Sequence, residues 1–470
     1  MQKKTSSFNR SGKNTSNEIN QEGSLNTGGT EKLRTFSLTM IVVGFVIGMG
    51  IFRTATDAAQ ASATPVIFFT AWILGGFVAF CGALTYAEIG SRYPVTGGYY
   101  KIFSYAYHPS VAFALNCVIL FSNAASLSGV AIIGSEYLLS AILGQDYPSY
   151  YNSILGIAAI GTFYGLNVLG LQVSSRAQNV LMMVKLAMLA LILLAGIVLP
   201  QAVSSGTPEF QSIGVKGFIL SLASALVAVS FTYGGYQQSI NFGEEVEQPS
   251  RTVPKGIMLG ILVVIAIYVL VNLSYFSTIG FEQLKSTKGI ASVIAYRLLG
   301  TAGERIFSVL LFVAVLAYVN VLMLSNPRVM YAMADDGVLP GIFQKKYGKH
   351  KVLLVNLTIF AFLSILTLMF ASTFDRILGF VMFLDSVGMV TSAATLFFMR
   401  KRKLGEERSG IYRMKWFPLA TIIFITAYLL VCGSIIVNTP HLALMGSIVF
   451  VGFLGLYLVI RKMFKRNNSL

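Results

Sequence analysis

The stretch TFSLTMIVVGFVIGMGIFRTATDAAQ, residues 35–60, is an apolar run interrupted by Gly48-Met49-Gly50. A helix that crosses a bilayer needs about 20 apolar residues, and this run supplies them. Each glycine lowers the helix propensity by about 1 kcal/mol relative to alanine. A break inside the membrane must face protein or water, because lipid cannot satisfy free backbone groups. Two interpretations remain at this point: a broken helix at a transport site, or glycines that allow close helix packing.

The composition places the chain in a membrane. Of its 470 residues, 55% are hydrophobic and only 11% are charged, whereas soluble domains carry about 25% charged residues. The net charge of +16 does not indicate nucleic-acid binding, because most lysines and arginines fall in predicted cytoplasmic segments, as the positive-inside rule expects. Basic residues also flank both ends. We therefore expect a multi-pass protein of the cell membrane with both termini in the cytoplasm.

Apolar runs predict an all-α integral membrane protein with twelve transmembrane helices. Residues 1–34 read as a disordered cytoplasmic tail. The first five spans occupy 35–200, the next five 201–400, and residues 401–470 hold two added spans and a short cytoplasmic tail. The expected spans are 36–61, 64–88, 109–141, 151–170, 175–200, 217–243, 253–279, 301–333, 352–372, 376–399, 417–438 and 441–461. The segment 281–305 has an amphipathic pattern that favours a position along the surface.

The sixth span repeats the interruption of the first. Its sequence, SLASALVAVSFTYGGYQQSINFGEEVEQPSRTVPKGI, covers residues 221–257, with Gly234-Gly235 in the middle of the apolar part. Polar side chains crowd around this pair, which is costly in a membrane unless they line a cavity. Span six comes five spans after span one, which is an odd number, so the second half is inverted. Matching interruptions in two inverted halves point to a transporter site.

Five sequence motifs resemble those of the amino acid–polyamine–organocation (APC) superfamily of amino acid permeases, nearest to its L-type amino acid transporter-like branch. They are, in chain order, GMGIF (48–52), YAEIGSRYPVTGGYY (86–100), FTYGGY (231–236), EEVEQPSRTVPKGI (244–257) and NPRVMYAMADDGVLP (326–340). The resemblance covers the chain from about residue 30 to its end. It implies a 5+5 inverted-repeat fold with two broken helices, spans one and six, plus two added helices.

The resemblance also implies a substrate site made of backbone groups. A carboxylate would bind N–H groups of the first break, and an α-ammonium would bind carbonyl groups of both breaks. On this sequence the N–H groups belong to Met49, Gly50 and Ile51, and the carbonyls to Val46, Ile47, Phe231, Thr232 and Gly234. The ring of Phe231 would close over the substrate, although an ordinary core phenylalanine is the alternative. Met49 departs from the smaller residues of many relatives, which bears on substrate size.

Two buried charges are candidate coupling or gating residues. Lys185 lies mid-span in the fifth apolar run, where a lysine costs about 2.5–3.5 kcal/mol. The resemblance places it beside the first break, as a fixed cation or, alternatively, as a group that exchanges a proton. Asn320 is a candidate partner for it. Asp385 in the tenth span is expected to pair with a cation, carry a proton, favour a cationic substrate, or stay protonated and structural.

Charges near the inner ends of the spans have two interpretations. They either form ion pairs of an inner gate or lie on a solvated surface, which is the simpler account for most of them. The residues concerned are Glu88, Arg92, Glu244, Glu245, Glu247, Arg328, Asp335 and Asp336.

The sequence favours a secondary active amino acid transporter over other classes. Convergent catalytic side chains are lacking, so we expect no enzyme, no cofactor and no metal site. Neutral substrates are favoured, because Lys185 would repel a second cation; transport of cationic amino acids or polyamines is the alternative, and a non-transporting amino acid receptor is another. Exchange and proton-coupled symport both stay open. Expected partners are the amino acid, the bilayer and a small accessory membrane subunit, without a disulfide link, since no cysteine falls in a predicted outer loop.

Overall fold

Helices account for nearly all regular structure in the computed structural model, which describes residues 32–48, 50–144, 146–199, 214–287, 289–370 and 374–467. Met49 and the expected tail segment 1–31 lie outside the described residues. In chain order the helices are α1 (Thr35–Val46), α2 (Gly50–Ala61), α3 (Pro65–Arg92), α4 (Gly98–Ala106), α5 (Pro109–Leu143), α6 (Tyr150–Val168), α7 (Leu171–Val198), α8 (Val215–Thr232), η1 (Tyr236–Asn241), η2 (Gly243–Glu245), α9 (Pro249–Ile279), α10 (Phe281–Ser286), α11 (Ile290–Asp335), η3 (Gly341–Gln344), α12 (Leu354–Phe370), α13 (Phe374–Lys401), α14 (Leu419–Asn438) and α15 (Pro440–Asn467).

Helix ends follow the local chemistry of the chain. Thr64 caps α3 by accepting a hydrogen bond from the backbone N–H of Ile67 at 3.3 Å, and Pro65 occupies the first helical position. A proline also opens α5, after His108. At its other end Gly144 adopts a φ of 86°, a conformation that glycine enters without steric cost. These signals begin and end long apolar helices.

Nine helices of the described chain are long and apolar enough to cross a membrane. Two shorter apolar helices, α1 and α12, accompany them. The first expected span is divided, because α1 ends at Val46 and α2 begins at Gly50. The sixth is divided as well, into α8 and the 3₁₀ helix η1. The count of twelve spans and the inverted repeat stay predictions.

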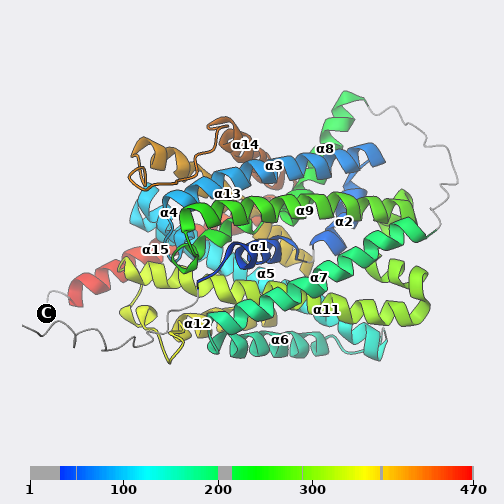
Figure 1. The fold of residues 1–470 in the computed structure, drawn as a ribbon, viewed down its shortest axis with the longest axis horizontal. Helices are drawn as coiled ribbons and strands as arrows, with labels where there is room; N and C mark the ends of the chain where they lie inside the picture. The colour runs from blue at the N-terminus through cyan, green and yellow to red at the C-terminus, as the bar shows by residue number, and fades with distance from the viewer. Residues whose placement is uncertain are drawn as a thin grey trace, which may run out of the picture. The chain divides into compact units, whose positions relative to one another are not determined.

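Burial separates central helices from peripheral ones. Of the 18 most apolar consecutive residues in each helix, 89% are buried inside the protein in α5 and 11% in α15. The helix α5 packs along α11, and α3 packs along α9. Figure 1 shows α3, α6 and α9 running in nearly the same direction. The broken helices α1 and α8 lie against α9 and α3 respectively, so both interruptions fall inside the protein rather than at its lipid-facing side.

The amphipathic segment 281–305 forms α10 and the start of α11, with a non-helical Gly300 (φ 65°) between that start and the long remainder. Its apolar side faces protein: Ile290 and Ile294 are fully buried, and Val293 and Leu298 pack against the core. Packing of these apolar side chains against the protein core therefore accounts for the amphipathic pattern that suggested a position along the surface.

Candidate functional site

The first helix break leaves two backbone carbonyls without helical partners, and side chains from distant helices bond them. The α1 helix ends with Ile47 at a ψ of 78°, and the N–H of Gly48 turns back to the carbonyl of Val46 at 2.8 Å. The Nζ atom of Lys185, on α7, donates to the carbonyl of Ile47. Lys185 has no exposed surface, so its ammonium replaces the helical donor that the break removes.

The second break is shaped by its own residues. Gly234 donates to the carbonyl of Phe231 at 3.2 Å, and the N–H of Gly235 donates to Oε1 of Gln237 at 2.9 Å. Gly235 adopts a φ of 107°, which L side chains rarely adopt. A Cβ there would lie 2.6 Å from the carbonyl oxygen of Phe45. Glycine is thus required both by the backbone conformation and by the approach of α1.

A tyrosine that sequence reasoning missed joins the two breaks. The hydroxyl of Tyr268, on α9, lies 2.9 Å from the carbonyl of Val46 and 3.1 Å from that of Thr232. Its ring is fully buried and packs against Trp72 and Tyr233, with centroids 5.6 and 5.0 Å away. The only signal in the sequence was that α9 carries two tyrosines within an apolar run, Tyr268 and Tyr275, because a buried hydroxyl usually has a hydrogen-bond partner.

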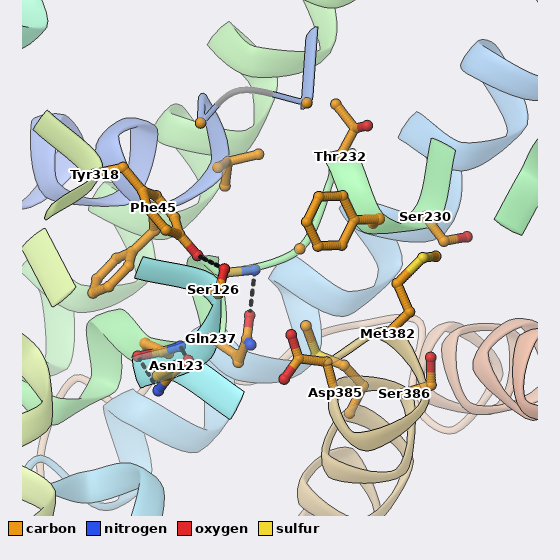
Figure 2. Close-up of a pocket in the computed structure, with 18 of the residues that line it drawn as sticks. Phe45, Asn123, Ser126, Ser230, Thr232, Gln237, Tyr318, Met382, Asp385 and Ser386 are labelled. Carbon is orange, nitrogen blue, oxygen red and sulfur yellow. Dashed lines mark hydrogen bonds between the residues drawn. The ribbon is translucent and has the colours of Figure 1, made fainter. Parts of the chain in front are cut away.

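A cavity lies between the two breaks (Figure 2). The space in it that is open to the centres of water molecules is about 60 Å³. Its walls come from the α-helices α1, α2, α5, α8, α11, α13 and α14, from η1 and from the unwound segments. Its lining includes Val46, Gly50, Phe231, Thr232, Gly234, Asn123, Ser126, Gln237, Tyr318, Met382, Asp385 and Ser386.

Most of the backbone positions named from the sequence meet at this cavity. Val46, Gly50, Phe231, Thr232 and Gly234 line it. Ile47 and Ile51 are fully buried beside it without lining it, and Met49 is outside the described residues. Lys185 and Asn320 also lie away from the lining. Asp385 reaches the cavity from α13 and accepts a hydrogen bond from the hydroxyl of Ser122 at 2.7 Å.

Polar side chains from α5, η1 and α11 occupy one side of the cavity. The hydroxyls of Ser126 and Tyr318 lie 2.9 Å apart, as Figure 2 shows. The amide of Asn123 exchanges hydrogen bonds with Gln238, and its Nδ2 also donates to Asn326 at 2.7 Å. These amides satisfy one another, so they are held in place without a bound molecule.

The side chain of Asn320, a candidate partner of Lys185 in the sequence analysis, bonds other residues instead. Its side-chain amide donates to the carbonyl of Ser174 at 3.0 Å and to Oε1 of Gln178 at 2.9 Å. Its Oδ1 accepts from Asn167 at 3.0 Å. The Asn320 amide therefore holds α6, α7 and α11 together. The described hydrogen bond of Lys185 goes to the carbonyl of Ile47 and not to Asn320.

A solvated surface is the wrong account for several inner charges. Glu88 has no exposed surface, and its carboxylate accepts from Arg92 at 2.7 Å, from Arg400 at 2.6 Å and from the N–H of Met414 at 2.9 Å. Arg328 is 7% exposed and bonds Glu245 at 2.7 Å. Burial of a charge is costly without such partners, so these residues hold this end of the helices together.

A second group of inner charges is more exposed. Lys101, on the short helix α4, bonds Asp335 at 2.6 Å and Asp336 at 2.5 Å. Burial lowers the pKa of Lys101, but the hydrogen bonds to the two carboxylates outweigh this and raise the pKa above its ordinary value. Arg34 lies 3.5 Å from Glu247. These pairs join α4 to α11 and the start of α1 to the segment before α9.

Comparison with known proteins gives consistent matches. A family model described as "Amino acid permease" matches residues 33–461. The serine/threonine exchanger SteT of Bacillus subtilis is 26% identical over 90% of this chain and 94% of its own. The branched-chain amino acid permease BcaP of the same species is 27% identical, over 78% of each chain. The mouse large neutral amino acids transporter small subunit 2 is 25% identical over 97% of this chain and 87% of its own. These names describe membrane transporters rather than enzymes.

Proposed function

The chain belongs to the amino acid permease family of the APC superfamily, as its motifs predicted, and on that premise we propose that it moves amino acids across the cell membrane by alternating access. The observation that carries the proposal is the cavity between two helix breaks, with unwound backbone from both at its walls. We propose a 5+5 inverted repeat with domain boundaries at residues 35, 201 and 401 as the frame in which the two breaks correspond.

The substrate carboxylate is placed at the start of α2. That helix begins at Gly50, so the N–H groups of Gly50 and Ile51 have no acceptor within the helix. Helix N-termini favour anions because of these free donors and the helix dipole. Gly50 lines the cavity, and a Cβ at this position would lie 2.8 Å from the side chain of Thr232. A side chain here would therefore narrow the space between the breaks. The N–H of Met49 is the third donor of this proposal.

The α-ammonium is placed at the second break. The carbonyl of Val46 already accepts from Gly48 and from Tyr268, which uses both of its lone pairs. The carbonyl of Ile47 accepts a hydrogen bond from the ammonium of Lys185. Phe231, Thr232 and Gly234 line the cavity, and the described bonds use one lone pair each of Phe231 and Thr232. These three carbonyls are the better acceptors, with Phe231 also supplying a ring over the substrate.

Lys185 supports exchange or facilitated flux of neutral amino acids as the first mode. Its ammonium fixes the carbonyl of Ile47 at the end of α1, where a second cation would be repelled. A lysine that cycles a proton would instead give symport. Asp385, as a carboxylate on the cavity wall, favours the second candidate, transport of cationic amino acids or polyamines.

The proposed setting is the cell membrane with both termini in the cytoplasm, from the charge distribution of the sequence. A small accessory membrane subunit is a proposed partner. The mouse relative is named a small subunit, a name that implies a further subunit beside the chain that resembles this one. A disulfide link to it is not expected, because Cys81, Cys117 and Cys432 lie within α3, α5 and α14.

Uptake of labelled amino acids into proteoliposomes tests the proposal. A transporter accumulates or exchanges label, whereas a receptor binds without flux and an enzyme changes the molecule. An exchanger moves label only when the opposite side holds unlabelled substrate. A proton symporter responds to an imposed pH gradient with that side empty. Saturable binding with no flux under either condition would contradict the proposal and favour the receptor.

A further inference from the structure

The cavity has one acidic wall and no basic one among its described lining residues. Asp385 is the single side chain of aspartate, glutamate, lysine or arginine type in that lining. Its Oδ1 accepts from Ser122, a buried hydroxyl on α5, at 2.7 Å. An ionised carboxylate accepts about four hydrogen bonds, so one serine leaves most of its capacity unused. The Asp385 carboxylate lines the cavity, so its unused lone pairs are available to a molecule bound there.

Asp385 lies away from the helix break that is proposed to hold the carboxylate. In Figure 2 the Asp385 carboxylate points toward the side of the cavity where Gln237 lies, and Thr232, at the second break, lies on the far side of the view from Asp385. Met382 and Ser386, on the same helix, line the cavity beside it. A zwitterion anchored at the breaks would therefore direct its side chain toward α13, and the end of that side chain would meet Asp385.

The size of the cavity limits that side chain. A single water needs about 10–15 Å³ of such space, so the roughly 60 Å³ here corresponds to about four to six water molecules. A compact amino acid fits this space, whereas an indole or guanidinium side chain requires the walls to move. The lining near Asp385 also includes polar groups of Ser126, Gln237 and Ser386, which suit a polar side chain.

We infer that Asp385 is a specificity-determining residue that selects amino acids with a short side chain ending in a hydrogen-bond donor. The inference rests on the proposed function and names the substrate class for the same cavity. Ser122 is the positioning residue, because its bond fixes one carboxylate oxygen and leaves the other for the substrate. Hydroxyl, amide and short ammonium groups all share this donor chemistry, and the test separates them.

The experiment is a competition panel built from pairs that differ in the donor. Threonine is compared with valine, serine with alanine, and 2,3-diaminopropionate with serine, each against one labelled substrate in proteoliposomes. The wild-type protein is expected to prefer threonine over valine by at least about tenfold, because a hydrogen bond to a charged group is lost with valine. Preference for diaminopropionate over serine would identify the ammonium as the better donor, and the reverse would identify the hydroxyl.

Variants assign the preference to the carboxylate. Asp385→Ala is expected to remove the threonine preference, and Asp385→Asn is expected to keep part of it, since an amide oxygen still accepts a hydrogen bond. The matched control is Thr391→Ala on the same helix, because among the described residues the Thr391 hydroxyl bonds only the carbonyls of Val387 and Gly388, within α13. The control should leave the threonine-to-valine ratio unchanged.

Two outcomes overturn the inference. One is a wild-type protein that transports valine as well as threonine; the other is an Asp385→Ala variant with the wild-type ratio. Either result leaves the proposed function intact, since amino acids still cross the membrane. Absence of flux for every member of the panel would instead refute the proposed function. The ratio is independent of expression level, so a purely structural role of Asp385 would not change it.

Discussion

The two helix breaks border one cavity but are kept open by different means. The first break depends on other helices: Lys185 from α7 bonds the carbonyl of Ile47, and Tyr268 from α9 bonds that of Val46. The second depends on its own residues, through the positive φ of Gly235 and the bond from its N–H to Gln237. Tyr268 also bonds the carbonyl of Thr232, so the two breaks share a contact from α9. They differ in that the first has a described bond from a charged side chain on a further helix, whereas the second has the glycine conformation and a bond from its own segment.

Removal of Lys185 should have the largest effect on transport. The variant Lys185→Ala leaves the carbonyl of Ile47 as a buried acceptor with its described donor gone, which costs about 1–3 kcal/mol. Exchange in proteoliposomes should fall by at least about tenfold, while monodisperse elution in detergent shows that the protein still folds. The exposed Lys255 provides the control, and Lys255→Ala should leave exchange unchanged. Normal exchange by Lys185→Ala would refute the dependence of the first break on α7.

A side chain at Gly235 tests the local character of the second break. Gly235→Ala places a Cβ 2.6 Å from the carbonyl oxygen of Phe45 in a backbone conformation with φ 107°, at a cost of about 1–3 kcal/mol. Flux should drop by about tenfold, together with a lower melting temperature in detergent. Gly433→Ala on α14 is the matched control, since a Cβ there meets no atom within 4 Å. Equal melting temperatures for both variants would show that the second break tolerates a side chain.

Loss of the Tyr268 hydroxyl should have an intermediate effect. Tyr268→Phe removes the single hydroxyl proton that the carbonyls of Val46 and Thr232 share, and it keeps the ring. With about 1 kcal/mol for a typical bond, we expect transport to fall roughly fivefold. Tyr275→Phe is the control, because the buried Tyr275 hydroxyl, further along the same helix, has no hydrogen-bond partner among the described residues. A loss of flux that is no larger in Tyr268→Phe than in Tyr275→Phe would remove the link between the breaks.

The smallest change concerns the side chain that closes the second break. Gln237→Ala deprives the N–H of Gly235 of its acceptor at 2.9 Å, but the glycine conformation remains. Flux should fall by only about twofold, near the low end for one hydrogen bond. Gln237→Glu retains an acceptor oxygen at this position and should behave more like wild type in the same uptake assay. A loss as large as that of Lys185→Ala would erase the difference between the two breaks.

The sequence predicts the breaks because glycine has a strong local effect on the helix. Gly48 and Gly50 flank the unwound segment, and Gly234 and Gly235 end α8. Lys185 is also predictable, since a lysine in the middle of an apolar run must find a partner. Asp385 is predictable on the same ground, and it lines the cavity.

The partners of these residues were not predictable, because they come from segments far apart in the chain. Tyr268 looks like one apolar-run tyrosine among several, and only the packing of α9 against α1 places its hydroxyl between the breaks. Ser122 is equally ordinary in sequence until it meets Asp385. Asn320 shows the opposite error, since a conspicuous polar residue turned out to bond Ser174 and Gln178 instead of the lysine.

The short segment 244–247 receives contacts from three separate parts of the chain. Glu244 accepts from Thr96, Glu245 bonds Arg328 through its side chain, and the backbone of Glu245 and Glu247 pairs with Leu33. Contacts that share one segment are energetically coupled, so the loss of one weakens the remaining two. The three contacts are therefore expected to form and break together, so that forms with only some of them have little population.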